Sequence, residues 1–282
     1  KRNISLVHQF FVNYPHMNVF DNIASPLRVA GLTRGEIQRR VEETADILQL
    51  RPMLKRRPEE LSGGQQQRCA LARAIVKESK AVFLDEPLAN LDYKLREELR
   101  DQLPDLFADR GAVVVYATSE PVEALLLGGK TALIHHGRLA QFGATAEIYR
   151  APVDLTSVRV FSDPPINMAP VRKQGDRVRL SETVDWSVTG AAAVLADGDY
   201  TLAVRPGHVS PDDISGQTVR ISGKVQITEL SGSESVAQFM VGNNIWVSQT
   251  SGALSYQVGE TRDFFIDKAH CFYFAPDGQL AA

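Results

Sequence analysis

The stretch RRPEELSGGQQQRCALARAIVKESKAVFLDEPLANLD (Arg56–Asp92) joins a Gly-Gly turn, a helical pattern, a short apolar run and an acidic turn. Ser62 and Gln65 have the spacing of a capping box, so we expect a helix to begin directly after Ser62. Gly63 and Gly64 then allow close backbone approach to the first helical amides, which form an anion site. The plain alternative is an ordinary capped helix that follows a tight turn.

The apolar runs of this half of the chain predict strands of a parallel sheet. AVFLD (Ala81–Asp85) and AVVVYAT (Ala112–Thr118) are short and continuously apolar, which is typical of strands buried on both faces. The first delivers Asp85 and Glu86 at its carboxyl end, where open α/β sheets bind ligands. One carboxylate can orient Mg²⁺ while the next activates a water for attack on phosphorus. An apolar strand that simply ends in an acidic turn is the alternative.

Helical patterns alternate with these strands. Asn18 and Asp21 form a capping pair for a helix that ends at Gly31, and Thr33 with Glu36 starts the next helix. Strand and helix alternation of this kind predicts a doubly wound α/β domain.

The second half of the chain has a different pattern. After FSDPPINMAP (Phe161–Pro170) the segments are β-branched and aromatic, with Gly, Asn or Asp at the breaks, and Gly242–Asn244 is a hairpin signal. Trp186 and Trp246 are expected to be core or barrel-edge aromatics. We therefore predict an α/β domain over residues 1–152 (with a helical subdomain over about 13–60), a linker over 153–170 and an all-β small barrel over 171–282.

Composition limits the class of protein. The 282 residues are 44% hydrophobic and 23% charged, and the net charge of -3 argues against a nucleic-acid binder, which needs a basic face. The two cysteines, Cys69 and Cys271, are too few for a disulfide framework and lack metal-ligand spacing. No apolar run reaches the ~20 residues of a membrane span, and no signal peptide is recognisable. A cytoplasmic protein is the expectation.

Taken together, the motifs resemble those of the ATP-binding subunits of ABC importers of the maltose and glycerol-3-phosphate type. The matching segments, in chain order, are the Q-loop glutamine Gln9, the signature LSGGQ (Leu61–Gln65), the Walker B strand VFLDEP (Val82–Pro87), the D-loop LANLD (Leu88–Asp92), GRLAQFGATAEIYRAP (Gly137–Pro152) and LAVRPGHV (Leu202–Val209). The last of these resembles the start of the C-terminal regulatory barrel called TOBE. ALLLGGKTA (Ala124–Ala132) resembles the glycerol-type subgroup.

The resemblance implies a role for each motif residue in a head-to-tail dimer around ATP. Asp85 would bind Mg²⁺, Glu86 would polarise the attacking water, and Gln9 would sense both metal and water. Ser62, Gly63, Gly64 and Gln65 would grip the γ-phosphate of ATP held by the partner. Asp92 would link the two sites of the dimer.

The first departure from the family pattern is the absence of its phosphate-binding loop, G-x-x-x-x-G-K-[ST], from these residues. Two explanations stand: the chain is part of a longer protein, or it is a truncated gene product. The first is favoured, because a parallel sheet without its P-loop strand would expose apolar edges. As written, the chain is not expected to hold ATP in its own site.

The second departure is Ser119, which stands where the family has a histidine that contacts the γ-phosphate. Serine is shorter and has no imidazole, so it can neither span that distance nor shuttle a proton near neutral pH. Ser119 is also a good helix N-cap ahead of Pro121. We expect the site of this subunit to be weakened, and a hetero-dimer with a second ATP-binding subunit is favoured over a homodimer.

The resemblance also implies partners and a location. The subunit would lie peripherally on the cytoplasmic side of the inner membrane, bound to permease subunits and acting indirectly with an extracytoplasmic solute-binding protein. A groove beside residues 13–31 would receive a permease helix, with Val19, Phe20 and Ile23 as candidate apolar contacts; simple core packing is the equal alternative. The alternative function is a regulatory or structural subunit that completes the partner's ATP site without hydrolysing ATP itself.

Overall fold

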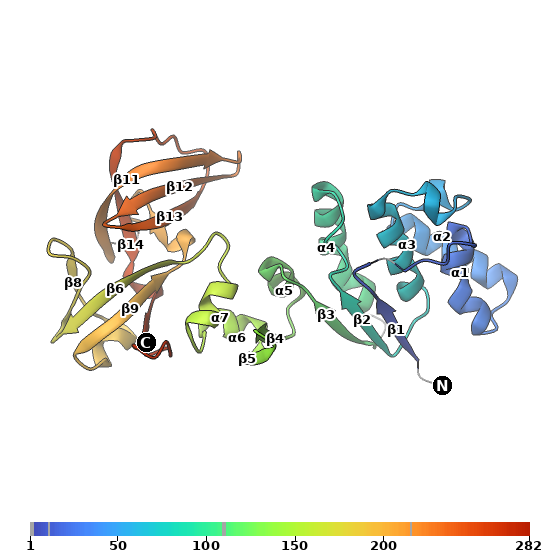
Figure 1. Ribbon diagram of the computed structural model, residues 1–282, viewed down its shortest axis with the longest axis horizontal. Helices are drawn as coiled ribbons and strands as arrows, with labels where there is room; N and C mark the ends of the chain where they lie inside the picture. Colours follow the sequence, from blue (N-terminus) through green and yellow to red (C-terminus); the bar gives the residue numbers. More distant parts are fainter. Residues whose placement is uncertain (1–2, 11, 109–110, 215) are drawn as a thin grey trace. The chain divides into compact units, whose positions relative to one another are not determined.

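A computed structural model describes residues 3–10, 12–108, 111–214 and 216–282. Contacts divide the chain into two compact units, Lys1–Leu127 and Gly128–Ala282. Among the residues that the structure describes, no helix has both the length and the apolar composition needed to span a bilayer. The fold class is confirmed: a parallel α/β unit is followed by an antiparallel β unit (Figure 1).

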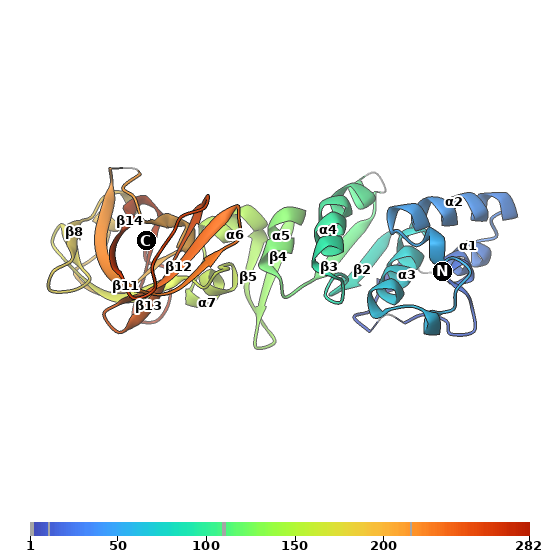
Figure 2. The same ribbon diagram turned by 90° about the horizontal axis from the view of Figure 1, so that it is seen from above.

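The first unit is built on a three-stranded parallel sheet in the order β1-β2-β3. Its strands are β1 (Ile4–Val7), β2 (Ala81–Asp85) and β3 (Val113–Ala117). Its helices are α1 (Val19–Val29), α2 (Arg34–Ile47), α3 (Gly63–Ile75), α4 (Tyr93–Ala108) and α5 (Pro121–Leu127), with short 3-10 turns η1 (Arg51–Met53) and η2 (Pro58–Glu60). Figures 1 and 2 both show α3 between β2 and the pair α1 and α2.

The prediction that the strands are buried on both faces is wrong for the described residues. Alternate side chains of the three strands are exposed on one face, and Leu6, Phe83 and Val115, which lie in register across the sheet, are 61%, 39% and 47% exposed. The other face is buried, with Val7, Val82 and Leu84 in the core of this unit. The apolar runs therefore identified the strands correctly, but they do not say which elements cover each face.

The three predicted helix starts are confirmed, because each is encoded by a few neighbouring residues. The side chain of Asn18 accepts a hydrogen bond from the amide of Asp21, and that of Thr33 from the amide of Glu36. Ser62 caps α3 in the predicted capping box with Gln65. The buried face of α1 then packs on α3.

Two of the three candidate permease contacts are core residues. Val19 and Ile23 are fully buried in the cluster that holds α1, α2 and α3 together, and Phe20 is partly buried against it. The alternative of core packing is therefore the correct one for Val19 and Ile23. Exposed apolar side chains lie instead just before α1, at Phe10, Val12 and Tyr14.

The helix that follows β3 begins at Pro121, as expected for proline in a first turn. The expected capping role of Ser119 is not seen. The oxygen that accepts a backbone hydrogen bond here belongs to Thr118, whose Oγ1 accepts from the amide of Glu120 at 2.9 Å. Ser119 lies one residue too early to cap a helix that starts at Pro121.

The second unit starts with the hairpin β4 (Lys130–His135) and β5 (Arg138–Ala144) and the short helices α6 (Thr145–Arg150) and α7 (Leu155–Val160). The turn of this hairpin is His136-Gly137, and both residues have positive φ. α7 and the start of the following strand fall within the segment predicted as a linker, where Phe161 and Ile166 are buried. The limits 153–170 stay a prediction.

The remainder forms two five-stranded antiparallel sheets, β15-β9-β6-β7-β8 and β10-β14-β11-β12-β13. Their strands are β6 (Asn167–Gln174), β7 (Arg177–Arg179), β8 (Asp185–Ser187), β9 (Gly198–Val204), β10 (Val209–Ser210), β11 (Thr218–Leu230), β12 (Glu234–Val241), β13 (Asn244–Ser251), β14 (Thr261–Asp267) and β15 (Cys271–Phe274), with 3-10 turns η3 (Gly190–Val194), η4 (Pro206–His208) and η5 (Lys268–His270). Trp186 and Trp246 belong to the one core that both sheets share, as predicted.

Candidate phosphate-transfer site

The parallel sheet brings the candidate residues of three segments to a single edge. Val7, Leu84 and Tyr116 are partners across β1, β2 and β3. Gln9 and Glu86 each lie two residues beyond their member of this row, and the same position after β3 is Thr118, next to Ser119. The predicted ligand-binding edge is therefore the edge where Gln9, Asp85, Glu86 and Ser119 leave the sheet.

Glu86 is held in a specific conformation by its surroundings. Its amide donates to the carbonyl of Ala117 at 2.9 Å, which extends the β2–β3 pairing by one residue. Its φ of 46° is unusual for a residue with a side chain. One carboxylate oxygen, Oε1, accepts a hydrogen bond of 2.9 Å from the amide of Ser119. The Glu86 carboxylate is thus tied to the loop after β3.

The buried amide of Gln67 connects α3 to the turn that contains Glu86. Its Nε2 donates to the carbonyls of Glu86 at 3.1 Å and Pro87 at 2.6 Å, and its Oε1 accepts from the amide of Asn90 at 3.2 Å. The Gln67 side chain is fully buried, so these bonds satisfy its own amide group, which water cannot reach. Gln67 was not among the predicted site residues.

The start of α3 leaves amides free for an anion. The capping box uses the amides of Ser62 and Gln65, and in the described part of the chain those of Gly63 and Gly64 have no acceptor. A Cβ at Gly64 would lie 3.4 Å from the carbonyl oxygen of Asn90, so a side chain there would reach the D-loop. These free amides and the small residues beside them fit a phosphate group.

The carboxylates of Asp85 and Asp92 are in different situations. Asp85 is half-buried, and within the described residues its carboxylate makes no hydrogen bond or ion pair, so its oxygens are free for a hard cation such as Mg²⁺. Asp92 instead caps α4, with Oδ1 accepting from the amide of Leu95 at 3.1 Å. Gln9 is exposed and, among the described residues, its side chain has no partner.

A buried carboxylate supports the loop that carries Ser119. Glu123 of α5 is 4% exposed and accepts hydrogen bonds from the hydroxyls of Tyr116 at 3.0 Å and Thr118 at 2.5 Å. Burial, and then the Glu123 charge, raise the pKa of Tyr116 well above its ordinary value, so the hydroxyl stays a donor. Ser119 contributes only its backbone amide to the hydrogen bonds of the described residues.

The structure therefore groups the predicted residues into two sets. Gln9, Asp85, Glu86 and Ser119 lie at the carboxyl edge of the sheet, and Ser62 to Gln65 lie at the start of α3, next to the D-loop. Gln67, Thr118 and Glu123 were missed. Of these three, only Gln67 had a signal in the sequence, because it is a polar residue among the apolar residues of one face of α3.

Comparisons with known proteins identify the family of the chain. Residues 1–89 match the ABC transporter family. The sn-glycerol-3-phosphate import ATP-binding protein UgpC of Cupriavidus necator is 33% identical over 287 residues, which cover 98% of this chain and 78% of that protein. The UgpC of Yersinia pestis is 34% identical over 281 residues, covering 99% and 78%.

A further relative and one solved structure are also similar. The uncharacterized ABC transporter ATP-binding protein YcjV of Escherichia coli is 32% identical over 286 residues, covering 99% of this chain and 79% of that protein. A dimeric, post-hydrolysis structure of the ATP-binding cassette MJ0796 bound to ADP and Pi is 27% identical with a TM-score of 0.47, and the match spans 51% of this chain and 63% of that one. The extent of the sequence matches shows that the chain belongs to the ATP-binding subunits of ABC importers.

Proposed function

We propose that this chain is the ATP-binding and energy-coupling subunit of a bacterial ABC importer for a sugar or polyol, of the glycerol or glycerol-phosphate type. The relatives named for sn-glycerol-3-phosphate import support this solute class. The observation that carries the proposal is the combination, in one chain, of free amides at the start of α3 with a fixed carboxylate, Glu86, at the end of β2. We keep the domain limits 1–152, 153–170 and 171–282 as part of this proposal.

The residues at the sheet edge act on the attacking water and the metal. Glu86 accepts the proton of a water that approaches phosphorus, and the Ser119 amide and the Gln67 side chain keep the Glu86 turn in place. Asp85 and Gln9 are the ligands offered to Mg²⁺. When bound there, Mg²⁺ would supply positive charge that offsets the negative charge developing on the phosphate during transfer.

The start of α3 serves the ATP of a neighbouring subunit. The amides of Gly63 and Gly64, with Ser62 and Gln65 around them, bind the γ-phosphate of a nucleotide held by the partner. Asp92 caps α4 and so fixes the end of the D-loop, which packs against Gly64. This arrangement requires a dimer of ATP-binding subunits.

The two sites of such a dimer are unequal in our proposal. Ser119 offers no imidazole to the γ-phosphate, and its amide is already engaged by Glu86. The start of α3, in contrast, offers the free amides of Gly63 and Gly64 at the positive end of the helix dipole, which supports a phosphate site there. We therefore infer that the natural dimer pairs this chain with a different ATP-binding subunit, whose own site this chain completes through α3.

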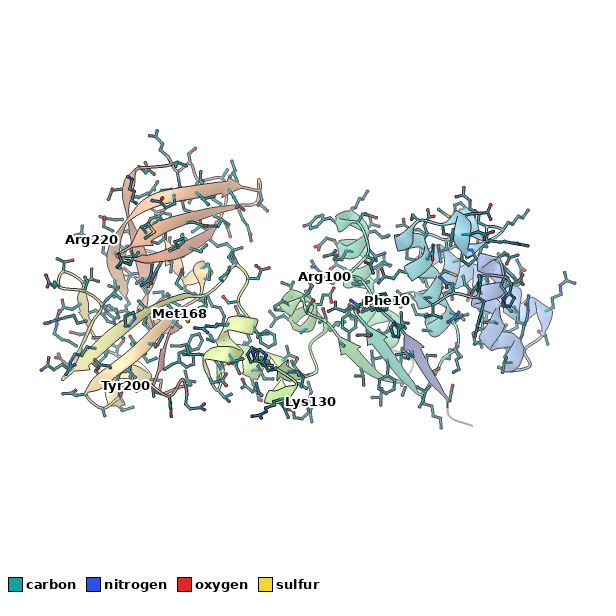
Figure 3. The ribbon with its side chains drawn as sticks, in the orientation of Figure 1. Phe10, Arg100, Lys130, Met168, Tyr200 and Arg220 are labelled. Atoms are coloured by element: carbon teal, nitrogen blue, oxygen red, sulfur yellow. The ribbon has the colours of Figure 1, made fainter. Side chains whose placement is uncertain are left out.

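The exposed apolar residues after β1 are the proposed contact with the permease subunits. Phe10, labelled in Figure 3, is 73% exposed, and Val12 and Tyr14 are exposed beside it. These residues follow Gln9, the proposed contact with metal and water. A movement of Gln9 would therefore be transmitted to a permease helix bound at this surface. The subunit would then lie peripherally on the cytoplasmic side of the membrane, with the solute-binding protein acting through the permease.

A steady-state ATPase assay tests this function. The protein expressed from its complete gene is purified as a homodimer and compared with a homologue that has histidine at the position of Ser119. We expect the ATPase rate of this protein to be at least about 100-fold lower than that of the homologue, because a positioned proton-transfer group contributes at least that factor. A rate equal to that of the homologue would contradict the weakened site.

A regulatory or structural subunit that does not hydrolyse ATP is the second candidate, and Ser119 is the observation in its favour. An assay of the mixed dimer, formed with the different ATP-binding subunit proposed above, distinguishes a hydrolysing subunit from a structural one. If the weakened site of this chain still hydrolyses ATP, Glu86→Gln in this chain removes the residual activity that the mixed dimer retains after the catalytic glutamate of the partner subunit has been substituted. If the chain is structural, that substitution has no effect, whereas substitution of Ser62 abolishes the activity.

A further inference from the structure

Three metal-ligating side chains that have no role in the proposed ATP site meet in the second unit. They are His208 at the end of η4, Asp267 at the end of β14 and His270 at the end of η5. One ligand atom from each lies within 4.8 Å of the others. Antiparallel pairing of Val209 with Ile266 explains the proximity, because it places His208 opposite Asp267.

The three side chains are already arranged with respect to one another. The imidazoles of His208 and His270 are stacked with ring centroids 3.8 Å apart and planes at 9°. Nδ1 of His270 lies 3.1 Å from Oδ2 of Asp267. The other oxygen, Oδ1, accepts a hydrogen bond of 3.0 Å from the amide of Ala269, which fixes the carboxylate.

The site is partly buried, and the side chain of Arg205 is engaged outside it. His208 and Asp267 are half-buried, whereas His270 is exposed. The nearby guanidinium of Arg205 is held elsewhere, donating to the carbonyl of Tyr149 at 2.6 Å and stacking on its ring at 3.7 Å.

We propose that His208, Asp267 and His270 form a binding site for a divalent transition-metal ion, with Zn²⁺ or Ni²⁺ as the fitting class. Imidazole and carboxylate are ligands that these ions accept, and solvent completes the coordination. Ligand atoms around a tetrahedral Zn²⁺ are roughly 3.4 Å apart, which follows from bonds of about 2.0–2.1 Å. The side chain of His270 is 51% exposed and can rotate to reach this spacing.

Isothermal titration calorimetry of the tag-free, EDTA-treated protein with ZnCl₂ and with NiCl₂ tests the site. We expect one saturable equivalent of metal at pH 7.5. His270→Gln and Asp267→Asn should each weaken metal binding at least tenfold, because each substitution removes a metal ligand and even the loss of a group that only orients a ligand costs about that factor. The control is the double variant His135→Gln and His136→Gln, since these residues also bring two imidazoles together, with centroids 4.1 Å apart in an edge arrangement. Its binding should equal that of the wild type.

Folding is monitored separately by thermal unfolding in EDTA. His270 is exposed, so His270→Gln should unfold at the wild-type temperature without metal. Zn²⁺ should then raise the unfolding temperature of the wild type and of the His135/His136 control, but not of His270→Gln. Absence of saturable binding, or equal binding by wild type and His270→Gln, would overturn the proposal. Loss of binding in the His135/His136 variant alone would move the site to the β4–β5 hairpin and would likewise overturn it.

Discussion

The carboxylate of Glu86 accepts a hydrogen bond of 2.9 Å from the backbone amide of Ser119. The bond joins the end of β2 to the loop after β3, and it uses no atom of the Ser119 side chain. Any residue other than proline can therefore preserve it at position 119. The side chain at this position is free to change the chemistry of the site without changing the support of Glu86.

The first prediction concerns Glu86 itself. Glu86→Gln should lower ATP hydrolysis by about 10²–10⁴-fold, because the site would lose the general base that we propose. Binding of ATP by the dimer should persist, since the glutamine Oε1 can still accept from Ser119 and the backbone carbonyl can still accept from Gln67. Single-turnover hydrolysis and nucleotide filter binding of the complete protein check both parts. Unchanged hydrolysis would remove Glu86 from the chemistry.

Gln67 provides a prediction on stability. Gln67→Leu leaves the carbonyls of Glu86 and Pro87 and the amide of Asn90 without their buried partner. We expect the free energy of unfolding to fall by about 2–4 kcal/mol, because unsatisfied buried groups cost about 1–3 kcal/mol each and part of the turn can relax. Urea unfolding measures the change. Gln66→Leu is the control, since that half-buried side chain makes one hydrogen bond of 3.3 Å.

Cys69 gives a prediction on pH. Burial raises the pKa of this thiol from 9.0 to about 12, so the folded protein retains the proton where the unfolded chain loses it. The corresponding stability is present below pH 9 and is lost as the pH rises from about 9 to about 12. Below pH 9 in native buffer, Cys69 should resist a thiol reagent that reacts at once in urea. Native labelling as fast as in urea, located at Cys69 by peptide mapping, would show that the thiol is accessible.

Gly223 of β11 gives a prediction for the β unit. A Cβ at this position would contact the ring of Phe239 and would lie 2.8 Å from the carbonyl oxygen of Met240. Phe239 is fully buried and stacked on Phe264 with centroids 3.7 Å apart, so it cannot move aside easily. Gly223→Ala should lower the free energy of unfolding of this unit by about 1–3 kcal/mol. Gly207→Ala, which meets nothing within 4 Å, should change it little.

Local signals allowed part of this structure to be predicted. The helix starts after Asn18, Thr33 and Ser62 were correct because each cap depends on residues three positions apart. The strand end at Asp85 and the Gly242 turn were likewise correct. In the caps and the turn the interacting atoms are neighbours in the sequence, and the strand was recognisable from its own apolar run.

Features that depend on distant residues were not predictable in this way. Nothing near Phe83 in the sequence says that one face of its sheet is exposed, and nothing near Gln67 says that its partners lie about twenty residues later. Val19 and Ile23 have the apolar pattern of either a core or a docking surface, and only the packing of α1 on α3 distinguishes the two. Thr118 and Glu123 became visible only through their shared hydrogen bond.

The central claim is that Ser119, and not the scaffold around it, weakens the site of this subunit. The most direct measurement is the steady-state ATPase rate of the homodimer from the complete gene, with and without Ser119→His, and with Glu86→Gln added as the control. We predict that Ser119→His raises the rate at least tenfold and that adding Glu86→Gln returns it to background. Equal rates for the wild-type protein and the Ser119→His variant, both abolished by Glu86→Gln, would contradict the claim.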